Sequence, residues 1–212
     1  MSTEVKIAQD LLKIKAVFLK PNDPFTWASG IHSPIYCDNR LTLSDVDVRN
    51  DVENALADII RTYYPECEAV MGTSTAGIAH AALVANILGL PMGYVRSSAK
   101  DHGRTNKIEG KCEPGTKVVV VEDLISTGGS CIDVVDALRE VGAEVLGVAS
   151  IFTYDLAKGL KRLEEANVIN HSASNFHTLI HVAADSGYIG KDDIEKCLQF
   201  QANPNDESWM NR

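Results

Sequence analysis

The segment VVVVEDLISTGGS, residues 118–130, places two adjacent acids before a loop of small residues. Glycines in such a loop let the backbone approach an anion closely, and a helix that begins there adds its positive dipole end. No lysine follows the glycines, so the loop differs from that of nucleoside triphosphatases. After the connecting Leu124 and Ile125, the residues predicted to form a phosphate cradle are Ser126, Thr127, Gly128, Gly129 and Ser130.

The two acids, Glu122 and Asp123, need a different partner, because carboxylates at this point would repel a phosphate. A vicinal diol suits them, since each carboxylate can accept two O–H hydrogen bonds. A phosphate cradle beside a diol-binding acid pair describes a site for ribose 5-phosphate. The alternative is an ordinary strand–turn–helix whose Ser and Thr cap the helix. The acid pair directly after a four-valine strand favours the functional interpretation.

A second segment, YVRSSAKDHGRTNKIEG at residues 94–110, is a long polar connection between two predicted strands. Loops of this length within a compact domain are uncommon and often act as lids. The segment concentrates positive charge that suits a pyrophosphate. Its basic residues are Arg96, Lys100, His102, Arg104 and Lys107. The alternative is a solvated surface loop, which is the usual role of a charge run.

Two further segments join short β-prone runs through small residues. The stretch FTWASGIHSPIYCDNR, residues 25–40, has Pro, Gly and Ser residues between short β-prone runs, which predicts a hairpin-like substructure. The stretch MGTSTAGI, residues 71–78, joins a predicted strand to a helix, so the backbone at Thr73, Ser74 and Thr75 is placed to hold a pyrophosphate. Ordinary turn chemistry is the alternative for both segments.

These segments resemble the orotate phosphoribosyltransferases, a branch of the type I phosphoribosyltransferase family. Residues 118–130 are similar to the family motif that binds phosphoribosyl pyrophosphate (PRPP). The similarity implies that Leu124 and Ile125 bind PRPP together with the acid pair and residues 126–130. The lid core Arg–x–x–x–Lys–x–His–Gly is matched by Arg96, Lys100, His102 and Gly103. The hood pattern S-G-x-x-S-P-x-Y-x-D-x-R is matched within residues 25–40. The resemblance runs from about Val5 to the last predicted helix.

The resemblance implies an enzyme of pyrimidine nucleotide biosynthesis that converts orotate and PRPP to orotidine 5′-monophosphate and pyrophosphate. Arg96, Lys100 and His102 would stabilise the leaving pyrophosphate together with Mg²⁺, with either Lys100 or His102 supplying a proton. Glu122 and Asp123 would hold the ribose hydroxyls.

The resemblance also implies that the loop 126–130 fixes the 5′-phosphate, while Ser126 and Tyr36 contact orotate. Mg²⁺ would arrive on PRPP, and no side chain is assigned as its ligand. The family further implies a homodimer in which each lid covers the partner's cradle.

The sequence departs from the family at several positions. Ala28, Ala76 and Ser97 stand where many members carry a lysine, and Tyr154 stands where an arginine helps to hold the orotate carboxylate. Two other functions therefore remain open at this point. One is a type I transferase that acts on a purine or uracil. The other is a PRPP-sensing regulator without catalysis, although such a protein needs a nucleic-acid-binding surface and no basic face is evident.

The composition restricts the possible roles. The 212 residues carry a net charge of −9, which disfavours a general nucleic-acid binder. The five scattered cysteines form neither a disulfide framework nor a zinc pattern, so reduced thiols are expected. The N-terminus lacks the apolar core of a signal peptide, and no stretch is long enough to span a membrane, so we expect a cytoplasmic protein. His177 and His181 are interpreted as one face of a helix.

The elements that must position these residues alternate between strand and helix after residue 64. Fully apolar runs such as VVVV are typical of parallel strands covered on both faces. The pattern predicts an α/β fold with a central, mainly parallel sheet flanked by helices. We expect one domain over residues 1–212, with a hood at about 1–40, a core at about 66–170, a lid at 97–110 and C-terminal helices at 174–201. Ser44 is expected to cap the helix that follows it, and the tail from Ala202 to fray.

Overall fold

The fold is organised around a six-stranded sheet with the strand order β10-β9-β8-β5-β6-β7. The computed structural model describes residues 1–97 and 107–211. All neighbouring strands pair in parallel except β6 and β7, which are antiparallel. This confirms the predicted mainly parallel sheet. Its strands are β5 (Ala69–Thr73), β6 (Met92–Val95), β7 (Ile108–Glu109), β8 (Lys117–Ile125), β9 (Glu144–Thr153) and β10 (Asn170–Asn175).

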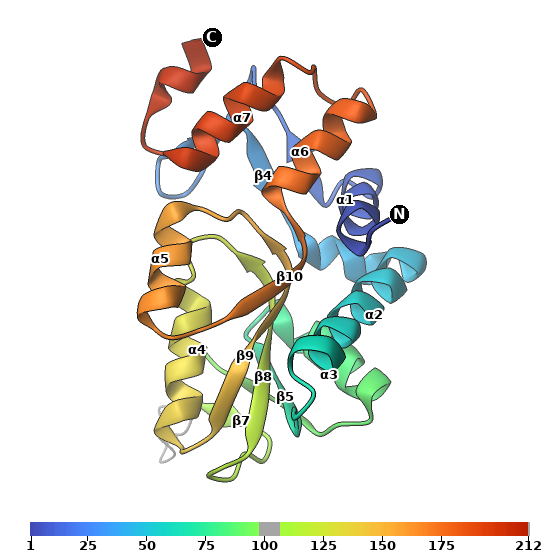
Figure 1. The fold of residues 1–212 in the computed structure, drawn as a ribbon, viewed down its shortest axis with the longest axis vertical. Coiled ribbons are helices and arrows are strands. Elements are labelled where there is room, and N and C mark those ends of the chain that lie inside the picture. The colour runs from blue at the N-terminus through green and yellow to red at the C-terminus, as the bar shows by residue number, and fades with distance from the viewer. Residues whose placement is uncertain (98–106, 212) are drawn as a thin grey trace.

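Helices cover both faces of the sheet (Figure 1). On one face lie α4 (Gly129–Glu140) and α5 (Ala157–Glu165), and on the other lie α2 (Val46–Tyr63) and α3 (Gly77–Leu88). The valine run of β8 serves both layers, because side chains alternate across a strand. Val119 and Val121 belong to the core under α2 and α3, whereas Val118 and Val120 belong to the core under α4. Two-sided burial therefore explains the unbroken apolar run.

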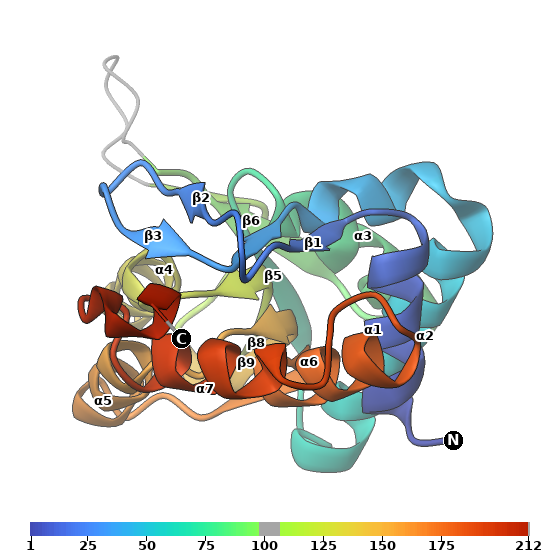
Figure 2. The ribbon, with the colours of Figure 1, turned by 90° about the horizontal axis from the view of Figure 1, so that it is seen from above.

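A hood lies beyond the carboxyl ends of the strands. It contains two small antiparallel pairs: β1 (Val17–Leu19) with β4 (Ile35–Cys37), and β2 (Phe25–Thr26) with β3 (His32–Ser33). The second pair confirms the predicted hairpin. The helices α1 (Thr3–Lys13), α6 (Phe176–Asp185) and α7 (Asp193–Ala202) complete this end of the molecule. Figure 2 shows the hood strands and the C-terminal helices side by side over the sheet.

Three local predictions were wrong. Ser44 ends the 3-10 helix η1 (Asn39–Ser44), and Asp45 caps α2 instead, accepting from the backbone N–H groups of Asp47 and Val48. The acids Glu122 and Asp123 lie within β8 and do not follow it. The last part of the expected lid is strand β7, which pairs with β6.

The C-terminal tail is not frayed, contrary to expectation. It forms the 3-10 helix η2 (Glu207–Asn211), and the indole of Trp209 is only 1% exposed. The ring packs edge-on against Phe200 of α7, with their centroids 5.8 Å apart. One large aromatic residue therefore anchors a polar tail. None of the helices in the described part of the chain is long and apolar enough to cross a bilayer.

Candidate active site

The side chain of Glu122 lies inside the molecule at the end of β8 and is only 4% exposed. Its Oε1 accepts hydrogen bonds from Thr73 Oγ1 at 2.6 Å and from the backbone N–H of Asp123 at 3.0 Å. Ser130 Oγ donates to Oε2 at 3.5 Å. Burial raises the pKa of Glu122 to about 8, although the hydrogen bond from Thr73 opposes this shift. Glu122 therefore links the segment 73–75 to the cradle.

Asp123, the second acid, is half-buried and more accessible. Its backbone carbonyl accepts a 2.7 Å hydrogen bond from the side-chain amide of Asn39, which is fully buried in the hood connection. Cys37 Sγ donates to Asn39 Oδ1 at 3.2 Å, so both the oxygen and the nitrogen of this amide are hydrogen-bonded. The two acids thus have different environments, and a hood residue fixes the backbone of the exposed one.

The predicted cradle forms a tight turn between β8 and α4. Gly128 has φ +73° and occupies the N-cap of α4, a left-handed conformation that glycine adopts without a steric penalty. Beneath the turn, Arg162 Nη1 of α5 donates to the carbonyl of Thr127 at 3.3 Å. The backbone N–H of Tyr154 donates to the carbonyl of Ile125 at 2.9 Å. The start of α4 and its loop therefore have the geometry of an anion site.

The expected pyrophosphate loop lies beside this cradle. Ser74 is fixed to β6, because its backbone N–H and its Oγ both donate to the carbonyl of Val95, at 3.2 and 2.6 Å. A cavity of about 110 Å³ opens between the loop, β6 and α4. Its lining brings together residues from four separate segments: Thr73, Ser74, Val95, Arg96, Ser97, Lys107, Ser130, Asp133 and Val134.

Two cations, Arg96 and Lys107, line this cavity. Arg96 Nη1 is buried and makes no hydrogen bond within the described part of the chain, and it forms an ion pair with Glu109 Oε1 at 3.7 Å. The backbone N–H of Arg96 donates to the carbonyl of Lys107 at 2.9 Å, which keeps the two residues adjacent. A buried guanidinium donor whose described partner is one carboxylate beyond hydrogen-bond distance is a suitable ligand for an anionic oxygen.

The hood contributes aromatic residues above the sheet. Trp27 stacks on Tyr154, with ring centroids 5.4 Å apart and planes 19° apart, and its Nε1 donates to the carbonyl of Ile35 at 3.1 Å. Trp27 therefore packs the hood onto the core. Tyr154 is buried beneath the hood by this stacking, and burial raises its pKa well above the ordinary value, with the charges of Cys37, Tyr36 and Asp123 raising it further. Tyr36 is 44% exposed.

The structure thus gathers Thr73, Ser74, Arg96, Glu122 and Ser130 around one point. Lys100 and His102, which were also expected there, lie outside the described residues. Lys107 was predicted only as one of the basic residues of the segment 94–110. Two contributing side chains were not predicted at all: Asn39 and Arg162. Asn39 lies within a segment whose importance was recognised, whereas nothing in the sequence near Arg162 indicated a contact with the cradle.

Comparison with known proteins agrees with this geometry. Residues 46–185 match the model of the phosphoribosyl transferase domain family. An orotate phosphoribosyltransferase of Bacillus cereus (strain B4264) is 57% identical over 205 residues, which cover 97% of this chain and 98% of the relative. The orotate phosphoribosyltransferase of Bacillus cytotoxicus shows the same identity and coverage.

Among solved structures, an orotate phosphoribosyltransferase from Aeropyrum pernix has a TM-score of 0.74 and 29% identity. The match covers 87% of this chain and 99% of that one. The identities favour an orotate-type transferase over the purine, uracil and regulatory alternatives. The chain therefore belongs to the orotate phosphoribosyltransferases of the type I phosphoribosyltransferase family.

Proposed function

We propose that this chain transfers the phosphoribosyl group of PRPP to orotate, giving orotidine 5′-monophosphate and pyrophosphate. The observation that carries the proposal is the convergence at the end of β8 of a helix N-terminus, an acid pair and a cavity lined by Arg96 and Lys107. These groups suit the three parts of PRPP: its 5′-phosphate, its ribose diol and its pyrophosphate.

Breaking the C1–O bond of PRPP leaves positive charge on the ribose ring and negative charge on the departing pyrophosphate. In the proposed mechanism the backbone N–H groups of residues 126–130 hold the 5′-phosphate. Arg96, Lys107 and the segment 73–75 bind the departing group, together with Lys100 and His102. Orotate already carries a negative charge, so it needs no strong base to attack the ring.

The two acids have different proposed roles. Asp123 is the accessible carboxylate, so it accepts the ribose hydroxyls and favours the positively charged ring. Glu122 is buried among Thr73, Ser130 and the Asp123 backbone, so it primarily fixes the distance between the two anion-binding loops. On the base side, Tyr36 and Ser126 contact orotate, and Tyr154 stands at the sequence position of the family's arginine.

Mg²⁺ is the proposed cofactor, and it neutralises charge on the pyrophosphate when bound. The residues present suit such a cation, because Asp123 offers one accessible carboxylate at the end of β8, while PRPP oxygens and water would supply the remaining ligands. A cytoplasmic location is also proposed. It is supported by the five cysteines, all of which are free thiols, as expected in a reducing compartment.

A base-panel assay tests the proposed reaction. The protein is incubated with PRPP and Mg²⁺ and with orotate, uracil, adenine or hypoxanthine in turn. Orotate should be consumed, as followed by loss of its absorbance, and the other bases should react far more slowly. Faster turnover of any other base would reject orotate as the substrate.

A pair of variants tests the site. Asp123→Asn should lower kcat/KM for PRPP about 10- to 100-fold, because charge-assisted hydrogen bonds to the diol are lost. Asp136→Asn, which removes an exposed acid of α4, should have no effect. Equal kinetics of the Asp123 variant and the wild type would contradict the role given to Asp123.

A further inference from the structure

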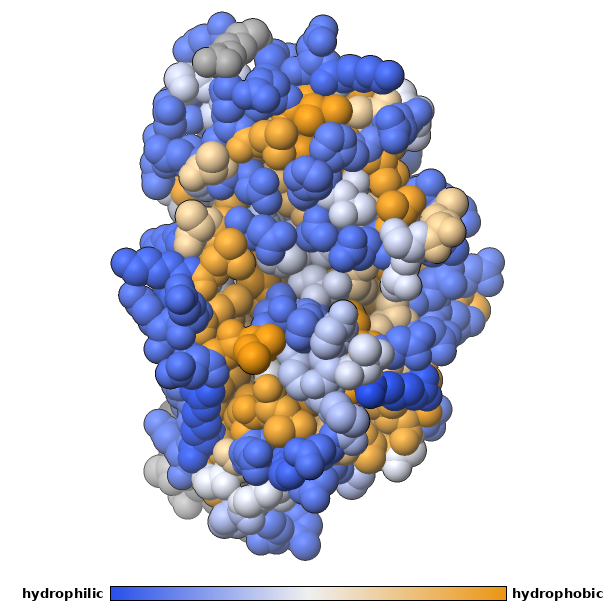
Figure 3. Space-filling model, viewed as in Figure 1, coloured by the Kyte–Doolittle hydropathy of each residue, from blue (hydrophilic) through white to orange (hydrophobic). Residues whose placement is uncertain are grey.

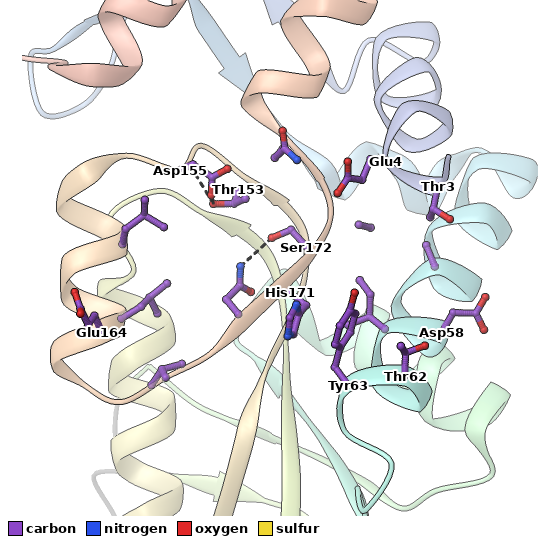
Figure 4. Close-up of a pocket in the computed structure, with 18 residues that line it drawn as sticks. Thr3, Glu4, Asp58, Thr62, Tyr63, Thr153, Asp155, Glu164, His171 and Ser172 are labelled. Atoms are coloured by element: carbon purple, nitrogen blue, oxygen red, sulfur yellow. Dashed lines mark hydrogen bonds between the residues drawn. The ribbon is translucent and has the colours of Figure 1, made fainter. Parts of the chain in front are cut away.

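A groove with a volume of about 590 Å³ lies along strand β10, away from the cradle. Figure 4 shows its lining side chains projecting from α5 on one side and from α1 and α2 on the other. None of the residues assigned to PRPP or orotate lines it. Its lining includes Glu4, Asp58, Tyr63, Asp155, Leu160 and Glu164.

The floor of the groove is an open sheet edge. β10 is the terminal strand of the sheet and pairs on one side, with β9. The backbone N–H of Val148 donates to the carbonyl of Ile169, and Asn170 is the register partner of Val148. In a parallel ladder the backbone groups of alternate residues point to opposite sides. Those of Asn170 and Ser172 therefore face away from β9, where another strand could pair with them.

Exposed apolar side chains flank this edge. Tyr63 of α2 is 55% exposed, Leu160 of α5 is 51% exposed, and Ile169, which directly precedes β10, is 63% exposed. The ring of Tyr63 stacks on His171 with centroids 3.7 Å apart, which stiffens the α2 side. Figure 3 shows hydrophobic surface beside a more polar strip on this face of the molecule. Such a cluster is typical of a docking surface.

The groove is also acidic. The described residues that line it include Glu4, Asp58, Asp155 and Glu164 and contain neither lysine nor arginine, and only Asp58 among the four is paired with a nearby cation, Arg61 at 2.9 Å. Asp155 and Glu4 both line the groove, and burial raises the pKa of Asp155, with the nearby charge of Glu4 raising it further. A second copy of the chain would bring the same four acids opposite these, so self-pairing is electrostatically disfavoured. Charge complementarity selects a basic partner.

We propose that this groove binds an extended, basic segment of a partner protein, which adds a strand to the open edge of β10. Main-chain hydrogen bonds to Asn170 and Ser172 would supply the pairing, as in other β-strand additions. Alternate side chains of the segment would point toward α5 or toward α2. Apolar ones would contact Leu160 or Tyr63, and basic ones would meet Glu164 or Asp58. The inference is independent of the proposed transfer reaction.

The test uses a fluorescent hexapeptide of alternating lysine and valine, with fluorescence anisotropy as the measurement. Two control peptides accompany it. One replaces each lysine by glutamate, and the other keeps every charge but carries N-methyl groups on the backbone, which remove the donors needed for strand pairing. The first peptide should bind, whereas each control should bind at least about tenfold more weakly. Equal binding of the N-methylated peptide would overturn the proposal.

Variants of the groove complete the test. Asp58→Asn combined with Glu164→Gln, and separately Leu160→Ser, should each weaken binding about tenfold. Glu140→Gln, an exposed acid of α4 outside the groove, should leave binding unchanged. All of these proteins should retain wild-type transferase activity, which verifies folding.

Two results would reject the proposed partner. The first is binding that the groove variants do not weaken beyond the Glu140 control. The second is a change in oligomeric state of Leu160→Ser in sedimentation velocity, because that would assign the surface to a second copy of the chain.

Discussion

Asn39 of the hood donates its side-chain amide to the backbone carbonyl of Asp123, 2.7 Å away, across a separation of 84 residues. The amide is completely buried, so this hydrogen bond is shielded from water. This hydrogen bond connects the hood, which is proposed to bind the base, with Asp123, which is proposed to bind the ribose. Because the transfer requires base and ribose to be positioned within reach of each other, a fixed hood should increase the rate of the transfer.

Asn39→Ala should lower kcat/KM for orotate about 10- to 100-fold, because a buried carbonyl loses its donor and the backbone at Asp123 is released. Steady-state kinetics would measure this loss, and urea unfolding would measure the accompanying loss of stability. Asn54→Ala, which removes an exposed amide of α2, is the matched control. Reduced stability with unchanged kinetics would show that Asn39 is structural only.

Glu122 should make stability depend on pH. Burial raises its folded-state pKa to about 8, above its ordinary value of 4.5, so the folded protein retains a proton that the unfolded chain releases. The stabilisation from this proton is complete below about pH 4.5 and is lost as the pH rises through about 8, at a cost of up to a few kcal/mol.

Glu122→Gln resembles the protonated acid and still offers an acceptor to Thr73. Urea unfolding between about pH 5 and pH 8 should therefore show a shallower decline for this variant than for the wild type. Glu140→Gln should follow the wild type, because that acid is exposed. Parallel declines for Glu122→Gln and the wild type would mean that Glu122 is ionised in the folded protein.

Residue patterns predicted the local structure well where a strand leads into a loop. The valine run, the glycines at 128–129 and the small residues at 73–75 carry local constraints that can be read from spacing. Strand β10 was not predicted, because its sequence, NHSASN, has neither apolar alternation nor β-branched residues. It is a strand because β9 supplies a pairing edge and Tyr64 donates to the carbonyl of Ile169, and both are long-range contacts.

The same reasoning applies within the site. Neither the amide of Asn39 nor the guanidinium of Arg162 has a sequence signature, because each acts on a backbone carbonyl far along the chain. Trp209 was misjudged for a related reason. Its polar neighbours indicated a solvated tail, whereas burial against Phe200 is a tertiary effect that local composition does not encode.

Trp209→Ala should destabilise the protein by about 3–5 kcal/mol, because it removes a large buried ring and leaves a cavity. Trp209→Phe should cost less, since the indole Nε1 is buried without a hydrogen-bond partner in the described structure and its removal relieves that penalty. Urea unfolding of both variants beside Asn211→Ala, an exposed neighbour, would measure this. Identical midpoints for all three would contradict an anchored tail.

Arg96 and Lys107 should control the affinity for pyrophosphate. Arg96→Ala should raise KM for PRPP and the inhibition constant for pyrophosphate together, each about 10- to 100-fold, because a charge-assisted donor is lost from the 110 Å³ cavity. Arg96→Lys should restore part of the affinity, since it keeps the charge but loses the fork. Lys111→Ala, which removes an exposed lysine, is the control. Unchanged pyrophosphate inhibition in Arg96→Ala would exclude this cavity as the leaving-group site.

The final prediction concerns assembly as a homodimer in which each lid serves the partner's cradle. Lys100→Ala and Asp123→Asn should each retain at most about a tenth of wild-type activity alone, at limiting PRPP. If lid and cradle come from different chains, a mixed dimer has one site with both defects and one with neither. Random re-association makes about half of the dimers mixed, so the refolded mixture should recover roughly a quarter of wild-type activity.

If both groups serve a site in the same chain, every site keeps one defect and mixing restores nothing. The experiment is to unfold, mix and refold the two variants and to assay the mixture beside each variant alone. A tag on one variant, followed by pull-down, establishes that chains have exchanged. Exchange without recovery of activity would refute the shared site, because two-fold symmetry then leaves no arrangement in which an intact lid meets an intact cradle.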